Sequence, residues 1–410
     1  MKVNAIKFYS TIFAILLLLQ LYVNSFKFNI LLQIFSLFIY FLFEKQTISL
    51  GFLKKTMPLF YLFLICFVGM FIHKYNNYNI IKDITHFIKP LFGIFIGYFF
   101  YKKINNFKLF VQTIVITSFI SSIIHFGIIV SLKNIVTVSD IREYTRDNFV
   151  ELFGLFFFMF YKKFQNEQLF RSRIVSNTIF ISLLISCILY FSRTMIVMSL
   201  IIIFTIYGYT IITKKTIKIG LGLLGFVLLL YVFLFSVNIQ RNQKGVESFL
   251  YKVKIAPAEI FKTHIDRDNH ADLWDHWRGY EAERAFSLLQ ENPSGYLFGL
   301  GYGSLVNLKF YAPLSGDKKG MKFISELHNG YVYVLYKTGI VGLFMYLFFL
   351  FQLYVKIYSN KNFTSVFLSA IGLSIFISTL VIGSLFNGNP TVLFLLGGLF
   401  FFEENNKNTL

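Results

Sequence analysis

The sequence predicts an all-α integral membrane protein with about 12 transmembrane helices and one long polar loop. Hydrophobic residues make up 56% of the 410 residues, and the mean hydropathy is +0.63. Apolar stretches of roughly 17–25 residues can cross a hydrocarbon core of about 30 Å as helices, and such stretches recur from one end of the chain to the other. A single polar segment, residues 240–328, interrupts this pattern.

The apolar stretches predict the helices in chain order. The sixth and twelfth stretches are short, so they are expected to cross with little tilt or to re-enter. The predicted spans are residues 8–24, 28–43, 57–72, 85–101, 108–131, 149–161, 174–191, 194–212, 217–239, 330–355, 363–384 and 390–402.

The distribution of Lys and Arg over the short loops predicts the orientation of these helices. With a cytoplasmic N-terminus, the cytoplasmic segments hold 18 Lys or Arg, whereas the short outer loops before the ninth helix hold 8. Both termini are therefore expected in the cytoplasm. The chain divides into an N-terminal bundle of about nine helices (1–239), a large outer loop (240–328) and about three C-terminal helices with a cytoplasmic tail (329–410).

The large loop is the segment most suited to carry function, because long loops in compact proteins usually do so. It holds 12 basic and 11 acidic residues, so the net charge of +19 comes from the other loops and indicates topology and anionic lipid or substrate rather than nucleic acid. Within the loop, residues 272–293 are expected to form a helix whose tryptophans, Trp274 and Trp277, lie at the membrane surface. The Gly-rich stretch 297–304 is expected to form a tight turn against the bilayer, and residues 80–90 a separate interfacial helix.

Three positions near the outer face are candidates for chemistry. Arg193, in "LYFSRTMIVMSL", is the only charged residue of an outer turn, where an arginine near hydrocarbon usually pairs or serves a site. Arg278 follows Trp277 in the loop, with Arg284 as its rival. His328 precedes Asn329 at the start of a membrane helix. Taken singly, each has a plainer interpretation: a snorkelling arginine, an exposed helix charge and a structural histidine.

Taken together, these residues suit a reaction at a pyrophosphate. Guanidinium groups match phosphate oxygens in charge and geometry, so two arginines could stabilise a pyrophosphate leaving group without a metal. A neutral histidine could take the proton of a sugar hydroxyl, because its pKa lies near neutral pH. No cofactor is expected.

In this set of residues the chain resembles the superfamily of bacterial O-antigen ligases and O-antigen polymerases. The matching elements are "SRTMIVMSL" (192–200), the series from Arg278 through Pro293 to "LFGLGYGS" (297–304), and "LHNGYVYVLYKTGIVG" (327–342). His328 and Gly339 have the His-x10-Gly spacing of the family, and Arg284 and Gly295 have an Arg-x10-Gly spacing described for polymerases. In the family a tryptophan often follows the loop arginine, whereas here both precede Arg278, which leaves the choice between Arg278 and Arg284 open.

The resemblance implies a multi-pass enzyme of the bacterial inner membrane whose large loop is periplasmic. Its donor would be a glycan on undecaprenyl pyrophosphate, with Arg193 and Arg278 on the pyrophosphate and His328 as the base. A polymerase, the preferred assignment, would join lipid-linked repeat units; a ligase would transfer the glycan to lipid A-core. Membrane lipids and a chain-length regulator protein are further candidate partners. A lipid-linked sugar flippase is the rival from another class, although it should carry charged residues deep in its helices.

Other polar residues carry weaker hypotheses. Arg142 and Arg146 could bind anionic glycolipid, and Asn329 could orient the His328 ring, whereas Lys337 is expected to be structural. A metal site is disfavoured at the recurring His and Asp residues of 264–276, because their spacing does not match one helix face. Cys66 and Cys187 lie in apolar stretches, so neither a disulfide nor a zinc site is expected.

Overall fold

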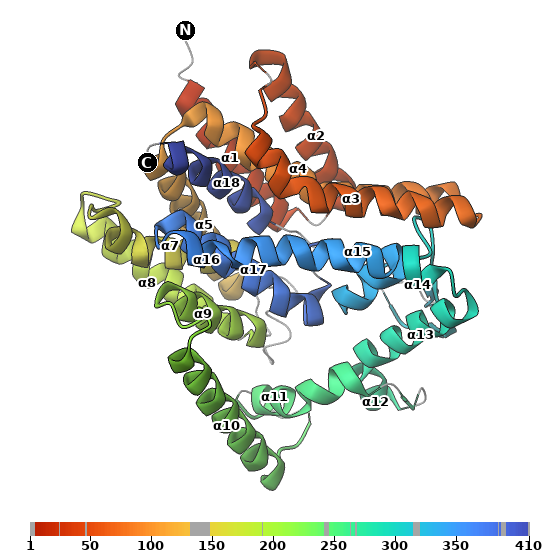
Figure 1. Ribbon diagram of the computed structural model, residues 1–410. Coiled ribbons are helices and arrows are strands. Elements are labelled where there is room, and N and C mark those ends of the chain that lie inside the picture. Colours follow the sequence, from red (N-terminus) through yellow and green to blue (C-terminus); the bar gives the residue numbers. More distant parts are fainter. Residues whose placement is uncertain are drawn as a thin grey trace.

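A helix occupies each of the twelve predicted spans in the computed structural model (Figure 1). The structure describes residues 5–23, 25–45, 47–131, 148–190, 192–241, 246–262, 264–266, 269–314, 320–383, 385–386 and 391–408. The helices are α1 Ala5–Tyr22, α2 Phe26–Phe43, α3 Leu50–Ile72, α4 Asn77–Ile104, α5 Phe107–Ser131, α7 Phe149–Gln165, α8 Arg173–Leu189, α9 Arg193–Ile206, α10 Lys214–Ser236, α15 Gly330–Tyr354, α17 Phe363–Ile382 and α18 Val392–Asn408.

Among the described residues, 8 helices are long and apolar enough to cross a membrane: α1 to α5, α10, α15 and α17. Two more, α8 and α9, are shorter apolar helices. The chain is therefore a predominantly helical, multi-pass membrane protein, and the count of twelve crossings remains a prediction.

The centre of the bundle is built on close helix contacts at small residues. A Cβ atom placed on Gly97 of α4 would lie 2.0 Å from the carbonyl oxygen of Phe394 on α18, and one on Gly397 would lie 2.1 Å from the carbonyl of Ile94. Small residues allow such approach between membrane helices, where tight packing replaces the hydrophobic effect as the driving force. The pair α4 and α18 thus forms a rigid centre for the surrounding helices.

The large loop folds into short helices and a hairpin. It contains α11 Val246–Phe261, α12 His270–Asp275, α13 Trp277–Glu291 and α14 Gly295–Phe298, followed by the antiparallel strands β1 Val306–Ala312 and β2 Met321–Ile324. The expected helix over 272–293 is thus broken at His276. The expectation that Trp277 faces the membrane surface is wrong, because only 5% of this residue is exposed and its indole binds Glu281.

The expected interfacial helix over residues 80–90 is instead the first part of α4, which continues through Pro90. Asp83, on this part, accepts a hydrogen bond of 2.5 Å from Lys337 of α15, and both side chains are buried. The polar residues of 80–90 therefore face protein rather than the membrane surface. Lys337 is structural, as expected.

The Gly-rich stretch after α14 packs against α15 rather than against the bilayer. Gly339 breaks the helical geometry of α15 with φ 65° and ψ −170°, a conformation that favours glycine. The backbone N–H of Leu300 donates to the carbonyl of Tyr336 (2.9 Å), and that of Gly301 donates to the carbonyl of Lys337 (3.0 Å). A Cβ at Gly339 would lie 2.3 Å from the Leu297 backbone, so the His-x10-Gly spacing has a structural reason at its glycine.

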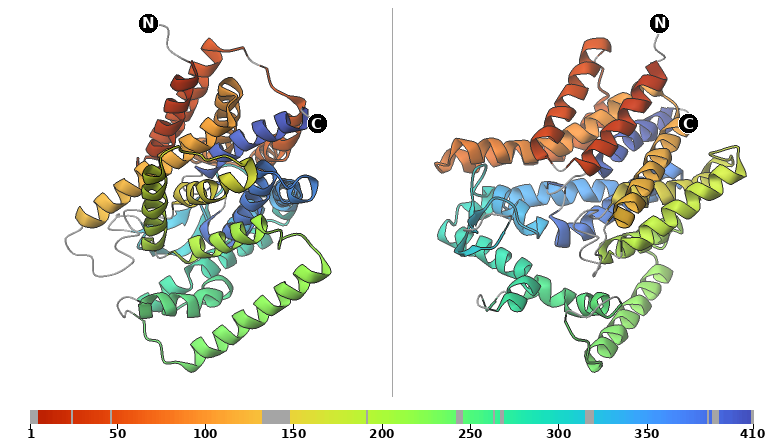
Figure 2. Two further views of the ribbon diagram at one scale, coloured as in Figure 1. Left: turned by 90° about the vertical axis from the view of Figure 1, so that its left-hand side faces the viewer. Right: turned by 180° about the vertical axis from the view of Figure 1, so that it is seen from behind.

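One helix stands apart from the rest. In both views of Figure 2, α10 lies away from the other membrane helices, and its larger contact among the described elements is with α11. Its surface is almost wholly apolar and exposed in the protein, which suits contact with lipid.

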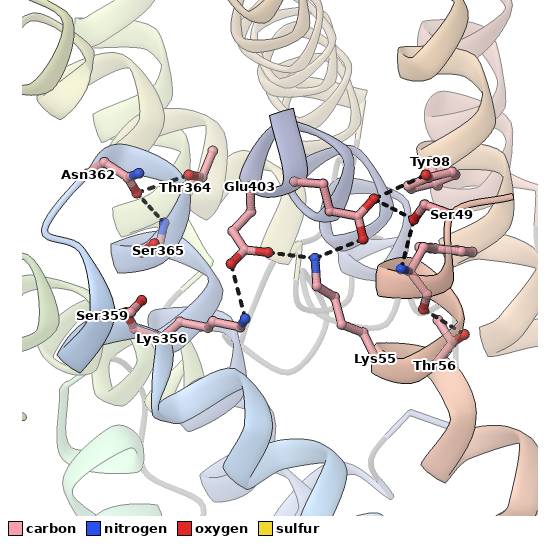
Figure 3. Close-up of polar contacts among 12 residues, drawn as sticks. Ser49, Lys55, Thr56, Tyr98, Lys356, Ser359, Asn362, Thr364, Ser365 and Glu403 are labelled. Carbon is pink, nitrogen blue, oxygen red and sulfur yellow. Dashed lines mark hydrogen bonds and ion pairs between the residues drawn. The ribbon is translucent and has the colours of Figure 1, made fainter. Parts of the chain in front are cut away.

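At the far end of α15 from His328, a carboxylate holds three helices together (Figure 3). Glu403 of α18 accepts from Lys55 of α3 (2.5 Å) and from Lys356 of α16 Lys356–Ser359 (3.1 Å). Glu404 also binds Lys55 (3.2 Å). We call Lys55, Lys356, Glu403 and Glu404 the Glu403 clamp.

Candidate active site

Arg193 begins α9 and points to a carboxylate of the large loop. Ser192 caps the helix by accepting from the N–H of Met195 (3.3 Å), which fixes Arg193 in the first turn. The Nη2 atom of Arg193 lies 3.3 Å from each carboxylate oxygen of Glu259 on α11, and its Nη1 donates to the carbonyl of Lys252. Arg193 therefore has a partner and does not simply snorkel.

Arg278 reaches the same carboxylate from the first turn of α13. Its Nη1 donates to Oε2 of Glu259 (3.0 Å), and its Nε donates to the carbonyl of Val381 near the C-terminal end of α17 (3.2 Å). Two arginines distant in the sequence thus converge on one side chain. We call Arg193 and Arg278 the arginine pair.

Arg284, the rival of Arg278, lies elsewhere. Its Nε donates to the carbonyl of Asn307 in β1 (3.0 Å), so it braces the hairpin against α13. Its Nη2 atom is buried and has no hydrogen-bond partner among the described residues. The geometry therefore pairs Arg278, and not Arg284, with Arg193.

His328 forms a dyad with a buried glutamate. Its Nδ1 atom lies 3.1 and 3.0 Å from the two carboxylate oxygens of Glu281 on α13, and its backbone N–H donates to Oε2 of the same residue (3.0 Å). Trp277 Nε1 also donates to Glu281 (2.5 Å). Glu281 is 2% exposed, whereas the His328 side chain is 52% exposed. Because a carboxylate accepts hydrogen bonds, it favours the tautomer with hydrogen on Nδ1, which leaves Nε2 as an acceptor.

Asn329 does not orient the imidazole, contrary to the sequence-based expectation. Its side-chain oxygen accepts from the backbone N–H groups of Tyr331 (3.1 Å) and Val332 (3.3 Å). It therefore caps the N-terminus of α15, where Asn is among the preferred residues. Glu281 takes the orienting position instead.

Helix α13 brings the arginine pair and the dyad together. Arg278 and Glu281 are three residues apart on it, and such positions are neighbours on one helix face. One therefore faces Glu259 while the other holds His328, and the end of α17 lies against the same turn. Figure 1 shows α13 beside the N-terminal end of α15, with α11 next to it. The residues of α13 that contact the two groups, Arg278 and Glu281, thus lie about one helical turn apart.

Two Asp residues of 264–276 are bound to basic side chains. Asp272 binds Lys262 (2.6 Å), and Asp275 binds Arg241 (3.1 Å) and Tyr251 (2.9 Å). The hydrogen bond from Lys262, with one from the backbone of Asp266, lowers the pKa of Asp272 to about 2. Within the described part of the chain, no three His, Cys, Asp or Glu side chains gather as metal ligands do.

Two site residues were not identified from the sequence, Glu259 and Glu281. Glu281 carried a local signal, because it stands three residues after Arg278 and four after Trp277 and so shares their helix face. Glu259 carried none, since its partners are far away along the chain. Arg142 and Arg146 lie outside the described residues.

Comparison with known families identifies this region. Residues 178–347, from α8 into α15, match the family model described as O-antigen ligase. None of the curated proteins compared with the chain matches it. The matched segment contains the arginine pair, both glutamates and His328, and it confirms the resemblance drawn from the motifs. Over residues 178–347 the chain is thus similar to the O-antigen ligase family, which is consistent with a member of the O-antigen polymerase and ligase superfamily.

Proposed function

We propose that the protein is an O-antigen polymerase that joins undecaprenyl-pyrophosphate-linked repeat units at the periplasmic face of the bacterial inner membrane. The observation that carries this proposal is the convergence of Arg193 and Arg278 on a single anionic group, Glu259. A place where two guanidinium groups already hold a carboxylate is suited to a pyrophosphate. The apolar helices around it would hold the lipid.

The arginine pair would act on the donor. Each guanidinium offers several N–H donors in a planar fork, and charge-assisted bonds to phosphate oxygens are about twice as strong as neutral ones. As the bond between the anomeric carbon and the pyrophosphate breaks, negative charge grows on the leaving oxygen. Preorganised cations lower the barrier because they stabilise that charge without reorganising.

His328 would act on the acceptor. Its Nε2 takes the proton from a sugar hydroxyl, the hydroxyl oxygen bonds to the anomeric carbon, and undecaprenyl pyrophosphate leaves with the electron pair of the broken bond. Glu281 then faces an imidazolium, which a buried carboxylate stabilises. No redox change or further reactant is needed, and we propose that the reaction is independent of metal.

The acceptor distinguishes the polymerase from the ligase. In the polymerase reaction the acceptor is a second lipid-linked repeat unit; in the ligase reaction it is lipid A-core. The loop 240–328 has 12 basic and 11 acidic residues, which gives little attraction for a heavily phosphorylated core and favours the polymerase. A chain-length regulator would then be a natural partner.

Gel separation of lipopolysaccharide from a deletion strain tests the assignment. The polymerase predicts lipid A-core capped by one repeat unit, because ligation continues while extension stops. Bare core, with long polymer retained on the lipid carrier, would instead assign the chain as a ligase. A complemented strain is the control, and it should recover the wild-type ladder.

A flippase is less well supported. The described helices do hold buried charges, contrary to the expectation that the polar residues gather in the loop alone. However, Asp83 and Lys337 bind each other, and Glu151 accepts from Ser121 (2.6 Å) and Ser186 (2.5 Å). Such groups with protein partners can serve the packing of the helices, and the loop site gives the transferase a catalytic pair that a flippase does not need.

A further inference from the structure

The arginine pair is occupied by a group of the protein itself. Glu259 lies between Arg193 and Arg278, at the position that the proposed function gives to the donor pyrophosphate. We propose that Glu259 is an internal latch: its carboxylate takes the place of the pyrophosphate in the empty enzyme, and donor binding displaces it together with the end of α11. This inference rests on the proposed function and adds a regulatory residue to it.

The contacts of Glu259 are those of a group that can be displaced. They measure 3.0 Å to Arg278 and 3.3 Å to Arg193, whereas charge-assisted N–H···O bonds are typically about 2.7–2.9 Å. Neither arginine makes two short parallel bonds to the carboxylate. Both arginines also donate to backbone carbonyls, those of Lys252 and Val381, which hold the guanidinium groups in place when the carboxylate leaves.

The charges favour exchange. Two guanidinium groups carry a charge of about +2, and Glu259, the acid that the described contacts place between them, balances half of it. A pyrophosphate diester carries two negative charges at neutral pH and so matches the pair more fully. Until the donor arrives, Glu259 partly neutralises the two cations, and because both arginines are about a quarter exposed, losing this contact costs little stability.

Helix α11 has a hinge next to the latch. Pro257 lies inside it, two residues before Glu259, and proline cannot donate the helical N–H to the carbonyl four residues earlier. That carbonyl, of Val253, instead accepts from the hydroxyl of Tyr231 on α10 (3.1 Å). The final turn of α11 is thus held by fewer backbone bonds than the rest, so it can swing without unwinding the helix.

Binding of farnesyl pyrophosphate to the purified full-length protein tests the latch. Trp277 directly precedes Arg278, and the ring of Trp274 packs against that of Trp277 at 5.6 Å between centroids, so the fluorescence of the two tryptophans can report binding. We expect Glu259→Gln to bind the probe about tenfold or more tightly than the wild type, because the competing charge is gone. Glu247→Gln removes the same charge from a partly exposed position on α11, where the Glu247 carboxylate accepts from the N–H of Gln240 (3.3 Å), and should bind as the wild type does.

Hydrogen exchange of the wild-type protein gives a readout that does not depend on the variant folding. Addition of the probe should speed exchange of the amides of residues 258–261 and leave those of α13 unchanged or slower. Unchanged or slower exchange at 258–261, or weaker binding by folded Glu259→Gln, overturns the latch.

The arginine variants separate this inference from the proposed function. Arg193→Ala and Arg278→Ala should lose binding of farnesyl pyrophosphate. If they lose it while Glu259→Gln gains nothing, the latch is wrong and the donor grip stands. If both arginine variants bind the probe as tightly as the wild type, the donor grip itself is wrong.

Discussion

The two ends of the bundle each hold a glutamate between two basic side chains, and the two arrangements differ in ways that matter. In the Glu403 clamp the carboxylate is 2% exposed and lies 2.5 Å from Lys55, with Glu404 as a second acid. At the arginine pair, Glu259 is 12% exposed and its closest contact is 3.0 Å. Among the described residues, the clamp has two acids for two lysines, whereas the pair has one acid for two arginines.

The difference indicates which arrangement is permanent. The clamp joins α3, α16 and α18, helices that belong to the packed bundle, and its charges balance. Glu259, which binds the arginine pair, lies on α11. The larger contacts of α11 among the described elements are with α10, α12 and α13 only. A buried cluster whose charges balance stabilises the fold. A cluster with excess positive charge next to a hinge is suited to bind an anionic ligand.

The two ends of the bundle are expected to lie on opposite sides of the membrane. The largest predicted difference between them is therefore in labelling by an impermeant reagent, which should occur at one end and be absent at the other. Single cysteines replacing Lys163, near the end of α7, and Asp317, in the large loop, would be treated with an impermeant thiol reagent in intact spheroplasts. The distribution of basic residues predicts labelling at position 317 and none at 163. The reverse pattern would overturn the orientation, and permeabilised cells give the control in which both react.

The next largest effect concerns the dyad. Glu281→Gln keeps the size of the side chain but removes the charge that orients His328, so kcat should fall by up to about 10⁴-fold, the loss seen when a catalytic histidine loses its orienting carboxylate. His328→Ala should abolish polymer formation. The KM for the lipid-linked donor should stay near the wild-type value in Glu281→Gln, because the arginine pair is intact.

A rise in that KM with kcat unchanged would contradict the role given to Glu281. The two kinetic constants are measured on purified protein with lipid-linked repeat units. Glu283→Gln, on an exposed part of the same helix, is the matched control and should show wild-type kinetics.

A smaller effect separates the two glutamates by stability. Glu403→Gln removes one negative charge from beside two lysines in a buried cluster. It should lower the free energy of unfolding by about 1–3 kcal/mol, the usual penalty for an unsatisfied buried group. Glu259→Gln lies at a more exposed pair and should cost less than about 1 kcal/mol. Thermal unfolding in one detergent compares them; a larger loss for Glu259→Gln would mean that α11 is a permanent brace.

Removal of metal ions is expected to have no effect on activity. If the arginine pair neutralises the pyrophosphate, purified enzyme should keep its activity in EDTA. Activity that is lost on chelation and restored by one divalent cation would contradict this. The carboxylates near His276 would then be candidate metal ligands. The enzyme without EDTA, assayed in the same buffer, is the reference.

The sequence predicted the helices well because hydropathy is local. It failed where a residue's role depends on a distant partner. Residues 80–90 were predicted to form a surface helix because their apolar residues recur at helical spacing, but Asp83 on their polar side is buried against Lys337, far along the chain. Gly339 was recognised by its spacing, whereas the reason for it, a kink that receives Leu300 and Gly301, is visible only in three dimensions.

The candidate site shows the same contrast between local signals, which the sequence carries, and distant partners, which it does not reveal. Arg193, Arg278 and His328 could be proposed because arginine and histidine are conspicuous at the boundary of apolar stretches. The choice between Arg278 and Arg284 could not be made, since both lie on α13 and only the positions of Glu259 and Asn307 distinguish them. The hairpin of β1 and β2 was not expected, because its strands are short and irregularly paired.

The central claim, that Arg193 and Arg278 together stabilise the pyrophosphate, is tested most directly by the rate of polymer formation with purified variants and lipid-linked repeat units. Arg193→Ala and Arg278→Ala should each lower the rate by about 10²–10³-fold, the usual loss for one preorganised charge-stabilising donor, while the protein remains folded. Lysine at either position should restore little, because it lacks the planar fork. Arg284→Ala, which loses a brace to β1, should keep most of its turnover per folded molecule. A normal rate for Arg278→Ala beside an inactive but folded Arg284→Ala would contradict the account.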